Sequence, residues 1–516
     1  MASISPLCFT RCYIRAGRTL PSMDESCARV LPASAACRSS HRPATAFPQS
    51  AAPLFPMNST SPAFSFAQRF RALACVSLGV VLAVLDSAIA NVALPTISRD
   101  LHVSESASVW VINAYQFAVA VSILPVAALG DRIGYRQAFL AGLTIFTVAS
   151  LGCALSGSLT TLTLFRLVQG IGAAGMMSVT GALLKQIYPP QQLGRGIAVN
   201  AMIVALSSAL GPSIAAAVLS LASWQWLFMI NVPIGSVAIV GSLSNLPFDR
   251  PKSNGRYDYP GAVANAGVLG LLMLCVDGLS NGQPLGYAAL AAVGSGVLGY
   301  FFVKRQLTQA VPLLPVDLLR IPLFRLSICT SVLSYTAQIL AFIAMPFLLQ
   351  NTFGYSAAQT GAYMTPWPIV IVVVAPLAGL LTDRHPAAIL STIGLALLSV
   401  GLALLVAMDV HASHLDLIWR MALCGAGFAL FQSPNNRSIM LSAPDHRSGA
   451  ASGMLSFARQ IGQMIGACIA TLLFDFLPQR GAAAALELAT ACAGIAALVS
   501  IARVATGRDA APHVPR

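Results

Sequence analysis

The sequence predicts an all-α integral membrane protein with 14 transmembrane helices. Between residues 73 and 503, fourteen mostly apolar stretches are each long enough to cross a hydrocarbon layer about 30 Å thick. Of the 516 residues, 56% are hydrophobic and only 9% are charged, well below the roughly 25% of soluble domains. No ten-residue alternating pattern suggests a barrel, and backbone amides in lipid must be satisfied internally, so we expect helices.

The expected helices follow one another through short polar connections. Each has about 18 to 25 residues of high apolar content, the length that a membrane-spanning helix requires. The predicted spans are residues 73 to 97, 108 to 129, 138 to 156, 160 to 183, 197 to 220, 224 to 246, 260 to 280, 286 to 303, 324 to 348, 358 to 381, 388 to 408, 414 to 433, 450 to 474 and 483 to 503.

The basic residues of the loops indicate the orientation of the chain. Counting Arg325, the second residue of the following span, fourteen Lys and Arg residues belong to the connections after even-numbered spans, whereas loops after odd-numbered spans hold only Arg99 and Arg480. Because Lys and Arg accumulate on the cytoplasmic side, we expect both termini in the cytoplasm of a bacterial cell, with the spans in its inner membrane. The net charge of +13 is dispersed over these loops and forms no stripe, so nucleic acid is not an expected partner.

Cysteine and histidine placement indicates neither disulfides nor a metal site. Seven of the eleven cysteines fall inside spans and none has C-x-x-C spacing, so they read as small packing residues. A loop at residues 409 to 416 carries Asp and His side chains, but their spacing matches no metal motif. We therefore expect no bound metal.

Residues 1 to 68 precede the first span and differ from it in composition. The segment up to residue 56 is rich in Ser, Pro and Arg and has no long apolar run, which predicts a disordered extension. An Arg-rich, acid-poor leader is also typical of a transit peptide. We prefer a misassigned start codon, with translation beginning at Met57.

Three landmarks recur at nearly one offset, which predicts a duplicated six-helix unit. Asp131-Arg132 is echoed by Asp383-Arg384, an offset of 252 residues (131 to 383), and Arg166 by Arg420, an offset of 254 (166 to 420). Arg195 is echoed by Arg447. The predicted parts are residues 69 to 247 and 324 to 504 as the two halves, 248 to 323 as an inserted helical hairpin with its flanking loops, and 505 to 516 as a tail. Two such halves can rock around a site at the membrane midplane.

Five motifs carry a resemblance to a known family. They are residues 85 to 95 in the first span, 129 to 136 in the next loop, 166 to 172 in span four, 210 to 212 in span five and 224 to 235 in span six. On these motifs the chain resembles the major facilitator superfamily, in its 14-helix drug:proton antiporter branch. It departs from the usual patterns at Ala127, Tyr135, Ser207, Ala215, Ala216 and Gln225.

This resemblance implies the major facilitator fold and a transporter rather than an enzyme. The expected activity is proton-coupled efflux of lipophilic, cationic small molecules by alternating access, carried out by a monomer. The proton gradient is the implied energy source, and no cofactor is expected. The partners are then the small-molecule substrate, protons and the lipid bilayer.

Asp86 and Arg166 are the predicted proton-coupling residues. Asp86 lies about thirteen residues into the first span, where a carboxylate costs about 2.5 to 3.5 kcal/mol, and ionisable residues at that depth are functional by default. Such a carboxylate could take up a proton and release it when the cavity rehydrates. The alternative is that Asp86 caps or pairs within its own half, and that Arg166 snorkels to the outer interface. The resemblance instead assigns Arg166 to the coupling machinery.

A charge lock is the second predicted site. Its residues are Asp131, Arg132, Gly134, Arg136, Asp383 and Arg384. Gly134 permits positive φ in a tight turn, and the acid before the arginine in both copies favours a lock between helix ends over an ordinary solvated loop. Gly211 and Pro212 form the predicted antiporter motif, which removes a backbone donor, kinks span five and lets helices pack closely. Proline is also tolerated in membrane helices without a special purpose.

Aromatic and polar side chains that suit an amphipathic or cationic substrate predict a substrate cavity. They are Trp110, Asn113, Tyr115, Gln116, Tyr335, Gln338, Tyr363 and Trp367, with Arg420 and Arg459 as interhelical hydrogen-bond donors that also qualify. Most aromatic residues in such bundles pack or lie at interfaces. One rival function is a proton-linked importer or a specific exporter on the same fold. The other is a membrane receptor or enzyme, which would need a catalytic constellation or a sizeable soluble domain.

Overall fold

The computed structural model describes residues 65–189, 192–248, 257–280, 282–309, 312–382, 384–409, 413–444 and 447–505. These residues form helices, and 14 of the helical segments are long and apolar enough to cross a membrane. The number and order of spans agree with the sequence prediction. The predicted disordered extension lies outside the described residues, apart from its last four positions.

The first unit contains six spans built from seven helices. They are α1 (Phe66–Asp100), α2 (Glu105–Ile133), α3 (Tyr135–Ala154), α4 (Leu159–Ile187), α5 (Leu193–Leu221), α6 (Gln225–Met229) and α7 (Asn231–Asn245). Helix α1 begins earlier than predicted because Ser65 and Gln68 form a capping box at its first turn. Helices α6 and α7 together make the sixth span.

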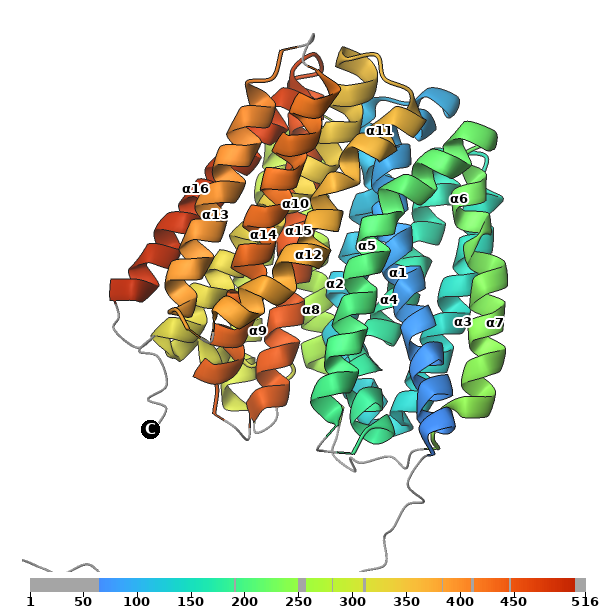
Figure 1. The fold of residues 1–516 in the computed structure, drawn as a ribbon, viewed down its shortest axis with the longest axis vertical. Helices are drawn as coiled ribbons and strands as arrows, with labels where there is room; N and C mark the ends of the chain where they lie inside the picture. The colour runs from blue at the N-terminus through green and yellow to red at the C-terminus, as the bar shows by residue number, and fades with distance from the viewer. Residues whose placement is uncertain are drawn as a thin grey trace, which may run out of the picture. The chain divides into compact units, whose positions relative to one another are not determined.

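The second unit follows a hairpin and also contains six spans. The hairpin is α8 (Tyr259–Ser280) and α9 (Leu285–Thr308), followed by a short 3₁₀ turn, η1 (Val316–Arg320). The unit comprises α10 (Pro322–Phe347), the π-helical turn η2 (Leu348–Thr352), α11 (Ala357–Met364), α12 (Pro366–Leu381), α13 (Ala387–Val406), α14 (His414–Ser442), α15 (Ser448–Phe476) and α16 (Gly481–Ala505). In Figure 1 it lies to the left of the first unit.

The two ends of the bundle need names. We call the end where α1 stops and α2 starts the Asp100 end, and the end where α2 stops and α3 starts the Gly134 end. In Figure 1 the Asp100 end, marked by α11, is at the top.

Close glycine contacts recur in the two units. A Cβ on Gly142 of α3 would lie 2.8 Å from the backbone oxygen of Gly172 in α4, and one on Gly394 of α13 would lie 2.7 Å from that of Gly427 in α14. The first positions differ by 252 residues (142 to 394) and the second by 255 (172 to 427). The α3–α4 pair and the α13–α14 pair therefore make the same kind of close backbone contact, which small residues make possible in membranes.

The hairpin packs against one helix from each unit, α2 and α15. Asn265 of α8 donates to the carbonyl of Val121 in α2 at 3.0 Å. At the start of α8, Asp258 accepts from Arg305 at 2.8 Å and from Gln306 at 3.2 Å, both on α9. These bonds hold the two hairpin helices together at the Gly134 end.

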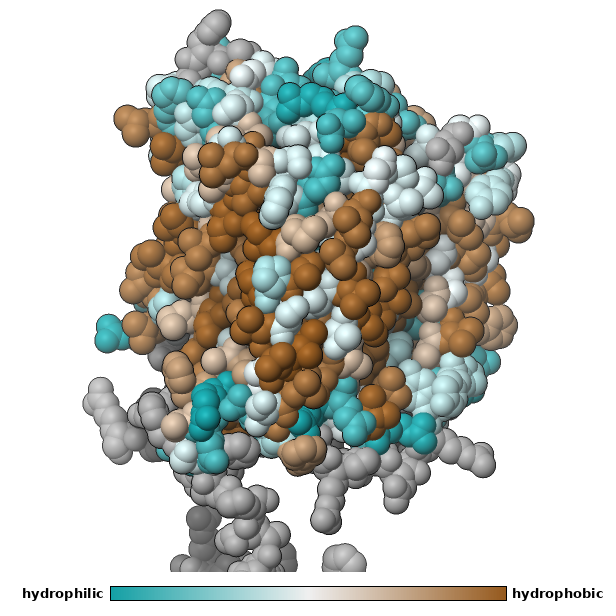
Figure 2. Space-filling model, turned by 90° about the vertical axis from the view of Figure 1, so that its right-hand side faces the viewer, coloured by the Kyte–Doolittle hydropathy of each residue, from teal (hydrophilic) through white to brown (hydrophobic). Residues whose placement is uncertain are grey.

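A hydrophobic surface surrounds the middle of the bundle. Figure 2 shows a band of hydrophobic residues between two hydrophilic ends. Large apolar side chains are more than half exposed on several helices, among them Val148 on α3, Val240 on α7 and Leu290 on α9. Apolar exposure on this scale is stable in lipid and not in water. The chain is a multi-pass membrane protein.

Candidate transport cavity and buried ion pair

A cavity of about 570 Å³ lies between the two units. Helices α1, α2, α4 and α5 line it from the first unit, and α10, α12, α14 and α15 line it from the second. Ligand pockets in helical bundles occupy such positions and have volumes of roughly 300 to 1,000 Å³. The cavity is therefore large enough for a small organic molecule.

The lining mixes polar and apolar side chains and is almost uncharged. Five of the predicted cavity residues line it: Tyr115, Gln116, Tyr335, Gln338 and Arg459. Further polar side chains that line it are Ser87, Asn91, Asn200, Ser208, Gln432, Ser433, Asn436, Gln460 and Gln463. The sequence prediction missed the amide side chains of α14 and α15, although amides spaced three or four positions apart in an apolar span mark one face of a helix.

The other five nominated residues are not among those that line this cavity. Trp110 belongs to a hydrophobic cluster with residues of α8 and α15. Asn113 donates to the Thr471 hydroxyl at 2.7 Å, and the Tyr363 hydroxyl bonds to His414 at 2.5 Å. Asn113 and Tyr363 thus form hydrogen bonds with side chains of neighbouring helices, which is the ordinary use of polar groups in membrane bundles.

Trp367 and Arg420 complete this set of five. Trp367 is fully buried, and its ring lies 5.2 Å from that of Phe342, edge to face. Arg420 is paired with Asp416 on its own helix at 2.6 Å and also donates to the Leu404 carbonyl. Both therefore stabilise the second unit.

A smaller cavity of about 130 Å³ extends the first one toward the Gly134 end. The two share Val84, Met177, Asn200, Val204 and Arg459. The additional lining residues of the smaller cavity are Val80, Ile123, Thr180 and Ser456. In every one of their helices these positions lie nearer the Gly134 end, so the hollow continues in that direction.

Contacts between the units gather at the Asp100 end. Arg99 of α1 donates to the side chain of Gln350 in η2 at 2.7 Å, and Asn351 donates to Glu105 of α2. Nearer the cavity, the hydroxyls of Ser213 and Thr365 are 2.7 Å apart. These bonds close the path between the units at this end.

Gly211 and Pro212 lie in this closed region, one helical turn beyond the cavity residue Ser208 of α5. A Cβ on Gly211 would come within 2.4 Å of the Cβ of Ala88 in α1. A Cβ on Gly361 of α11 would come within 2.3 Å of the Pro212 carbonyl oxygen. The motif thus lets α5 approach one helix of each unit at backbone distance.

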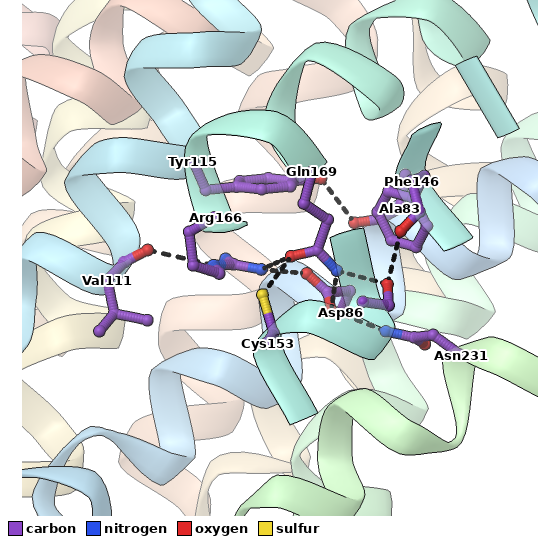
Figure 3. Close-up of polar contacts among 10 residues, drawn as sticks. Ala83, Asp86, Val111, Tyr115, Phe146, Cys153, Arg166, Gln169 and Asn231 are labelled. Carbon is purple, nitrogen blue, oxygen red and sulfur yellow. Dashed lines mark hydrogen bonds and ion pairs between the residues drawn. The ribbon is translucent and has the colours of Figure 1, made fainter. Parts of the chain in front are cut away.

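Asp86 is buried in the first unit, where it forms an ion pair with Arg166 of α4 (Figure 3). Its other oxygen accepts from Gln169 at 3.0 Å and from Asn231 of α7 at 2.8 Å. Arg166 also donates to Gln169 at 2.7 Å and to the Val111 carbonyl at 3.1 Å. Both carboxylate oxygens thus receive N–H donors, the arrangement that a buried charge requires.

The aromatic ring of Tyr115 separates this ion pair from the cavity. The Arg166 guanidinium lies 4.2 Å from the centre of that ring, and Tyr115 itself lines the cavity. The Tyr115 hydroxyl donates to the Ala83 carbonyl at 3.2 Å, which fixes the ring in place (Figure 3). Asp86 does not line the cavity, whereas Ser87 beside it does.

These positions bear on the alternatives left open for the two charged residues. Arg166 is 1% exposed and Asp86 2%, so Arg166 does not snorkel to an interface. In this conformation Asp86 is paired with Arg166 within the first unit. Sequence reasoning gave no role to Gln169 or Asn231. Gln169 could have been found from its position three residues after Arg166, on the same helix face.

The second unit lacks an equivalent ion pair. At the offset of 252 residues (86 to 338) the counterpart of Asp86 is Gln338, which lines the cavity. The counterpart of Arg166 is Arg420, which pairs within its own helix. The two units therefore differ at this position.

The predicted lock residues lie at the Gly134 end. Gly134 has φ 102°, the positive value expected of it. Arg136 donates to the Leu243 carbonyl at the end of α7, and its guanidinium lies 3.7 Å from the centre of the Phe248 ring. Asp131 accepts from the Tyr135 hydroxyl at 2.6 Å. Of the second copy, Arg384 is exposed and Asp383 lies outside the described residues.

Within the described ranges, no group of three or more His, Cys, Asp and Glu side chains could hold a metal ion. His411, from the loop considered above, is not among those residues. The candidate site is thus a cavity of a size that suits an organic molecule, beside a buried ion pair.

Fourteen spans around a central cavity define a membrane transporter rather than an enzyme. The chain belongs to the Major Facilitator Superfamily, whose sequence model matches residues 76–467. The fold is also that of a solved peptide-type transporter, described as a "POT family transporter in complex with thioalcohol conjugated peptide". That structure has a TM-score of 0.66 and 16% identity, with 85% of this chain and 96% of the other chain covered.

Three relatives illustrate the range of the family. The chain is 50% identical to the "Uncharacterized transporter YebQ" of Escherichia coli, over 86% of this chain and 97% of the relative. It is 27% identical to the "Riboflavin transporter RibZ" of Clostridioides difficile (79% and 88%). It is 30% identical to the "Multidrug resistance protein Stp" of Mycobacterium tuberculosis (76% and 74%).

Proposed function

We propose that the chain is a proton-coupled exporter that moves lipophilic small molecules out of the cell by alternating access. The observation that carries this proposal is the cavity between two units that are bonded to each other at the Asp100 end. The basic loops support a cytoplasmic position for the Gly134 end, with both termini there, in a bacterial inner membrane. The described conformation is then open toward the cytoplasm.

The Asp86–Arg166 pair is the proposed coupling site. In the present conformation the acid has an arginine and two amide donors. Separating the pair would leave two charges without partners in a medium of low dielectric constant, and a proton on Asp86 removes the part of that cost that belongs to the acid. Proton uptake by Asp86 would therefore accompany a rearrangement of α1 and α4. We propose that this movement reopens the contacts at Gly211 and Pro212.

Export is supported by two lines of evidence beyond the fold. The relative from Mycobacterium tuberculosis carries a multidrug resistance name, and the motif at Gly211-Pro212 is typical of antiporters of this branch. The net proton gradient supplies about 2.3 kcal/mol per charge at 100 mV and about 1.4 kcal/mol per pH unit. One proton can then support a gradient of several hundredfold, so neither a cofactor nor a second subunit is required.

The test compares efflux-deficient cells that express the wild type, Asp86→Asn or an empty vector, in a panel of lipophilic drugs. We expect the wild type to raise resistance to at least one compound and Asp86→Asn to abolish the gain at equal expression. A panel in which no compound distinguishes expressing cells from empty cells contradicts multidrug export. Uptake into inside-out but not right-side-out vesicles is the expected direction, and the reverse would indicate an importer.

A further inference from the structure

The charge of the cavity differs from the one expected for a cation carrier. Arg459 of α15 is the charged side chain among the residues that line the larger cavity, and it also lines the smaller one. Within the described part of the chain it has no hydrogen-bonding or ion-pair partner. A guanidinium with all its donors free is thus presented to the cavity.

No carboxylate of the described residues balances this charge inside the cavity. Asp86 lies in α1 beside the cavity residue Ser87, but it does not line the cavity and is already paired with Arg166. A bound cation would meet an uncompensated like charge, whereas an anion would meet an unsatisfied donor. The electrostatics of the cavity therefore disfavour the cationic guest that the sequence suggested.

The side chains around Arg459 complete a site rich in donors. Gln460 and Gln463 lie on the same helix, and Gln116 of the first unit also lines the cavity. Carboxamides donate two N–H groups each, and the planar guanidinium binds carboxylates in a bidentate manner. An anionic group placed here would receive bonds from both units.

Apolar side chains also line the cavity. Ile339 and Phe342 of α10, Ile371 of α12 and Phe428 of α14 contribute to its wall. Aliphatic and aromatic surface of this kind holds the hydrocarbon or ring part of a ligand, while the few polar groups fix its orientation. The cavity thus combines one anion-binding corner with a hydrophobic wall.

We propose that this cavity binds amphipathic organic anions, with an acidic group on Arg459 and an apolar or aromatic body against α10, α12 and α14. The proposal rests on the proposed function and specifies its substrate class. Exchange of one proton inward for one monoanion outward carries two positive charges inward, so the membrane potential assists the cycle. The same exchange with a monocation would be electroneutral.

The test uses two dyes that share a three-ring xanthene skeleton and differ in charge. Fluorescein is anionic at slightly basic pH, and rhodamine 123 is cationic. The full-length protein in nanodiscs of zwitterionic lipid is titrated with each dye, and binding is followed by fluorescence polarisation. We expect fluorescein to bind more tightly than rhodamine 123 by about tenfold or more, the value of one charge-assisted hydrogen bond.

Three variants assign the preference to the guanidinium. Arg459→Gln should weaken fluorescein binding about tenfold or more and leave rhodamine 123 unchanged or tighter. Arg459→Lys retains the charge and should recover most of the fluorescein affinity, and Arg459→Glu should reverse the preference. Arg480→Gln removes one positive charge at a site where the side chain is 76% exposed, so it is the matched control and should change neither titration.

The outcomes separate this proposal from the proposed function. A wild type that prefers rhodamine 123, fails to bind fluorescein, or loses both dyes equally on Arg459→Gln overturns the anion site. Each of those results leaves proton-driven export in place, because that is judged by Asp86→Asn in the resistance and vesicle experiments. With an anion bound, collapsing the membrane potential at constant pH gradient should slow export, and an unchanged rate would also count against the anion site.

Discussion

Asp86 of α1 and Arg166 of α4 form an ion pair that is almost completely shielded from solvent, and the ring of Tyr115 lies between this pair and the cavity. The pair joins two helices of one unit and does not bridge the two units. Substrate in the cavity therefore cannot touch the acid directly in this conformation. Coupling between them has to pass through Tyr115 or through movement of α1.

The first prediction concerns the energy of this pair. Removing one partner of a buried ion pair leaves the other charge uncompensated and costs about 3 to 5 kcal/mol, whereas replacing both by apolar residues of similar size is often nearly neutral. We expect Asp86→Leu and Arg166→Met each to lower the free energy of unfolding by this amount. The double variant should be less destabilised than the sum of the single variants.

Unfolding of the purified protein in mixed detergent measures these differences. Arg420→Met is the matched control, because its ion pair with Asp416 is partly exposed and should contribute about 1 kcal/mol or less. Strictly additive effects of Asp86→Leu and Arg166→Met would mean that the two side chains do not stabilise each other.

The second prediction concerns Tyr115 as the wall of the cavity. Tyr115→Ala removes the ring and should let water reach the ion pair, so protons should leak through vesicles severalfold faster in the absence of substrate. Tyr115→Phe keeps the ring and loses only the bond to the Ala83 carbonyl, so it should leak little. The decay of an imposed pH gradient measures both. Equal leak rates for the two variants would show that the ring is not a barrier.

The number and order of the helices could be predicted from the sequence because lipid imposes one simple rule. Each span must be apolar over about 30 Å, and its backbone must be satisfied internally. Both constraints can be recognised in a single stretch of chain. The same holds for Gly134, whose positive φ follows from a tight turn between two spans.

The cavity could be predicted only in part, because facing inward is a property of three-dimensional packing. Tyr115, Gln116, Tyr335, Gln338 and Arg459 were identified, since polar groups in apolar spans tend to face polar surroundings. That tendency does not distinguish a cavity from a helix interface. Asn113 illustrates the difference, because its amide meets a hydroxyl of α15 rather than open space.

The position of Asp86 shows a second limit of sequence reasoning. Its depth in the membrane indicated function, but its partners come from α4 and α7, up to 145 positions away. Only the packing of α1 against those helices decides that the acid turns away from the cavity. The anionic substrate proposed above likewise depends on one side chain, Arg459, whose access to the cavity comes from packing.

The third prediction tests close packing at Gly211. A Cβ there would lie 2.4 Å from that of Ala88, so Gly211→Ala must push α5 away from α1. We expect a loss of about 1 to 3 kcal/mol in stability and a clear loss of transport, because this contact lies where the units meet. Gly453→Ala is the matched control, since nothing lies within 4 Å of its added Cβ. Resistance assays and thermal unfolding compare the two. Equal behaviour of both variants would contradict a packing role for Gly211.

The last prediction concerns pH and the bonds by which Asp258 of the α8–α9 hairpin connects the two helices. Partial burial acts to raise the pKa of this carboxyl group, but bonds from Arg305, from the Gly261 backbone amide and from Gln306 outweigh it, and the pKa is lowered. A folded pKa below the unfolded one, which is about 4, means that the stabilisation is fully present above pH 4. It is lost as the pH falls through the folded pKa.

Asp258→Asn isolates this charge, because asparagine can still cap α8 by accepting from Gly261. At neutral pH we expect the variant to be less stable than the wild type by about 1 kcal/mol or less, since Arg305 is 42% exposed and its ion pair is screened by water. Melting of both proteins in detergent from neutral pH to below pH 4 should show the difference shrinking toward the acid end. A difference that stays constant or grows on acidification would mean that the carboxylate form of Asp258 does not hold the hairpin together.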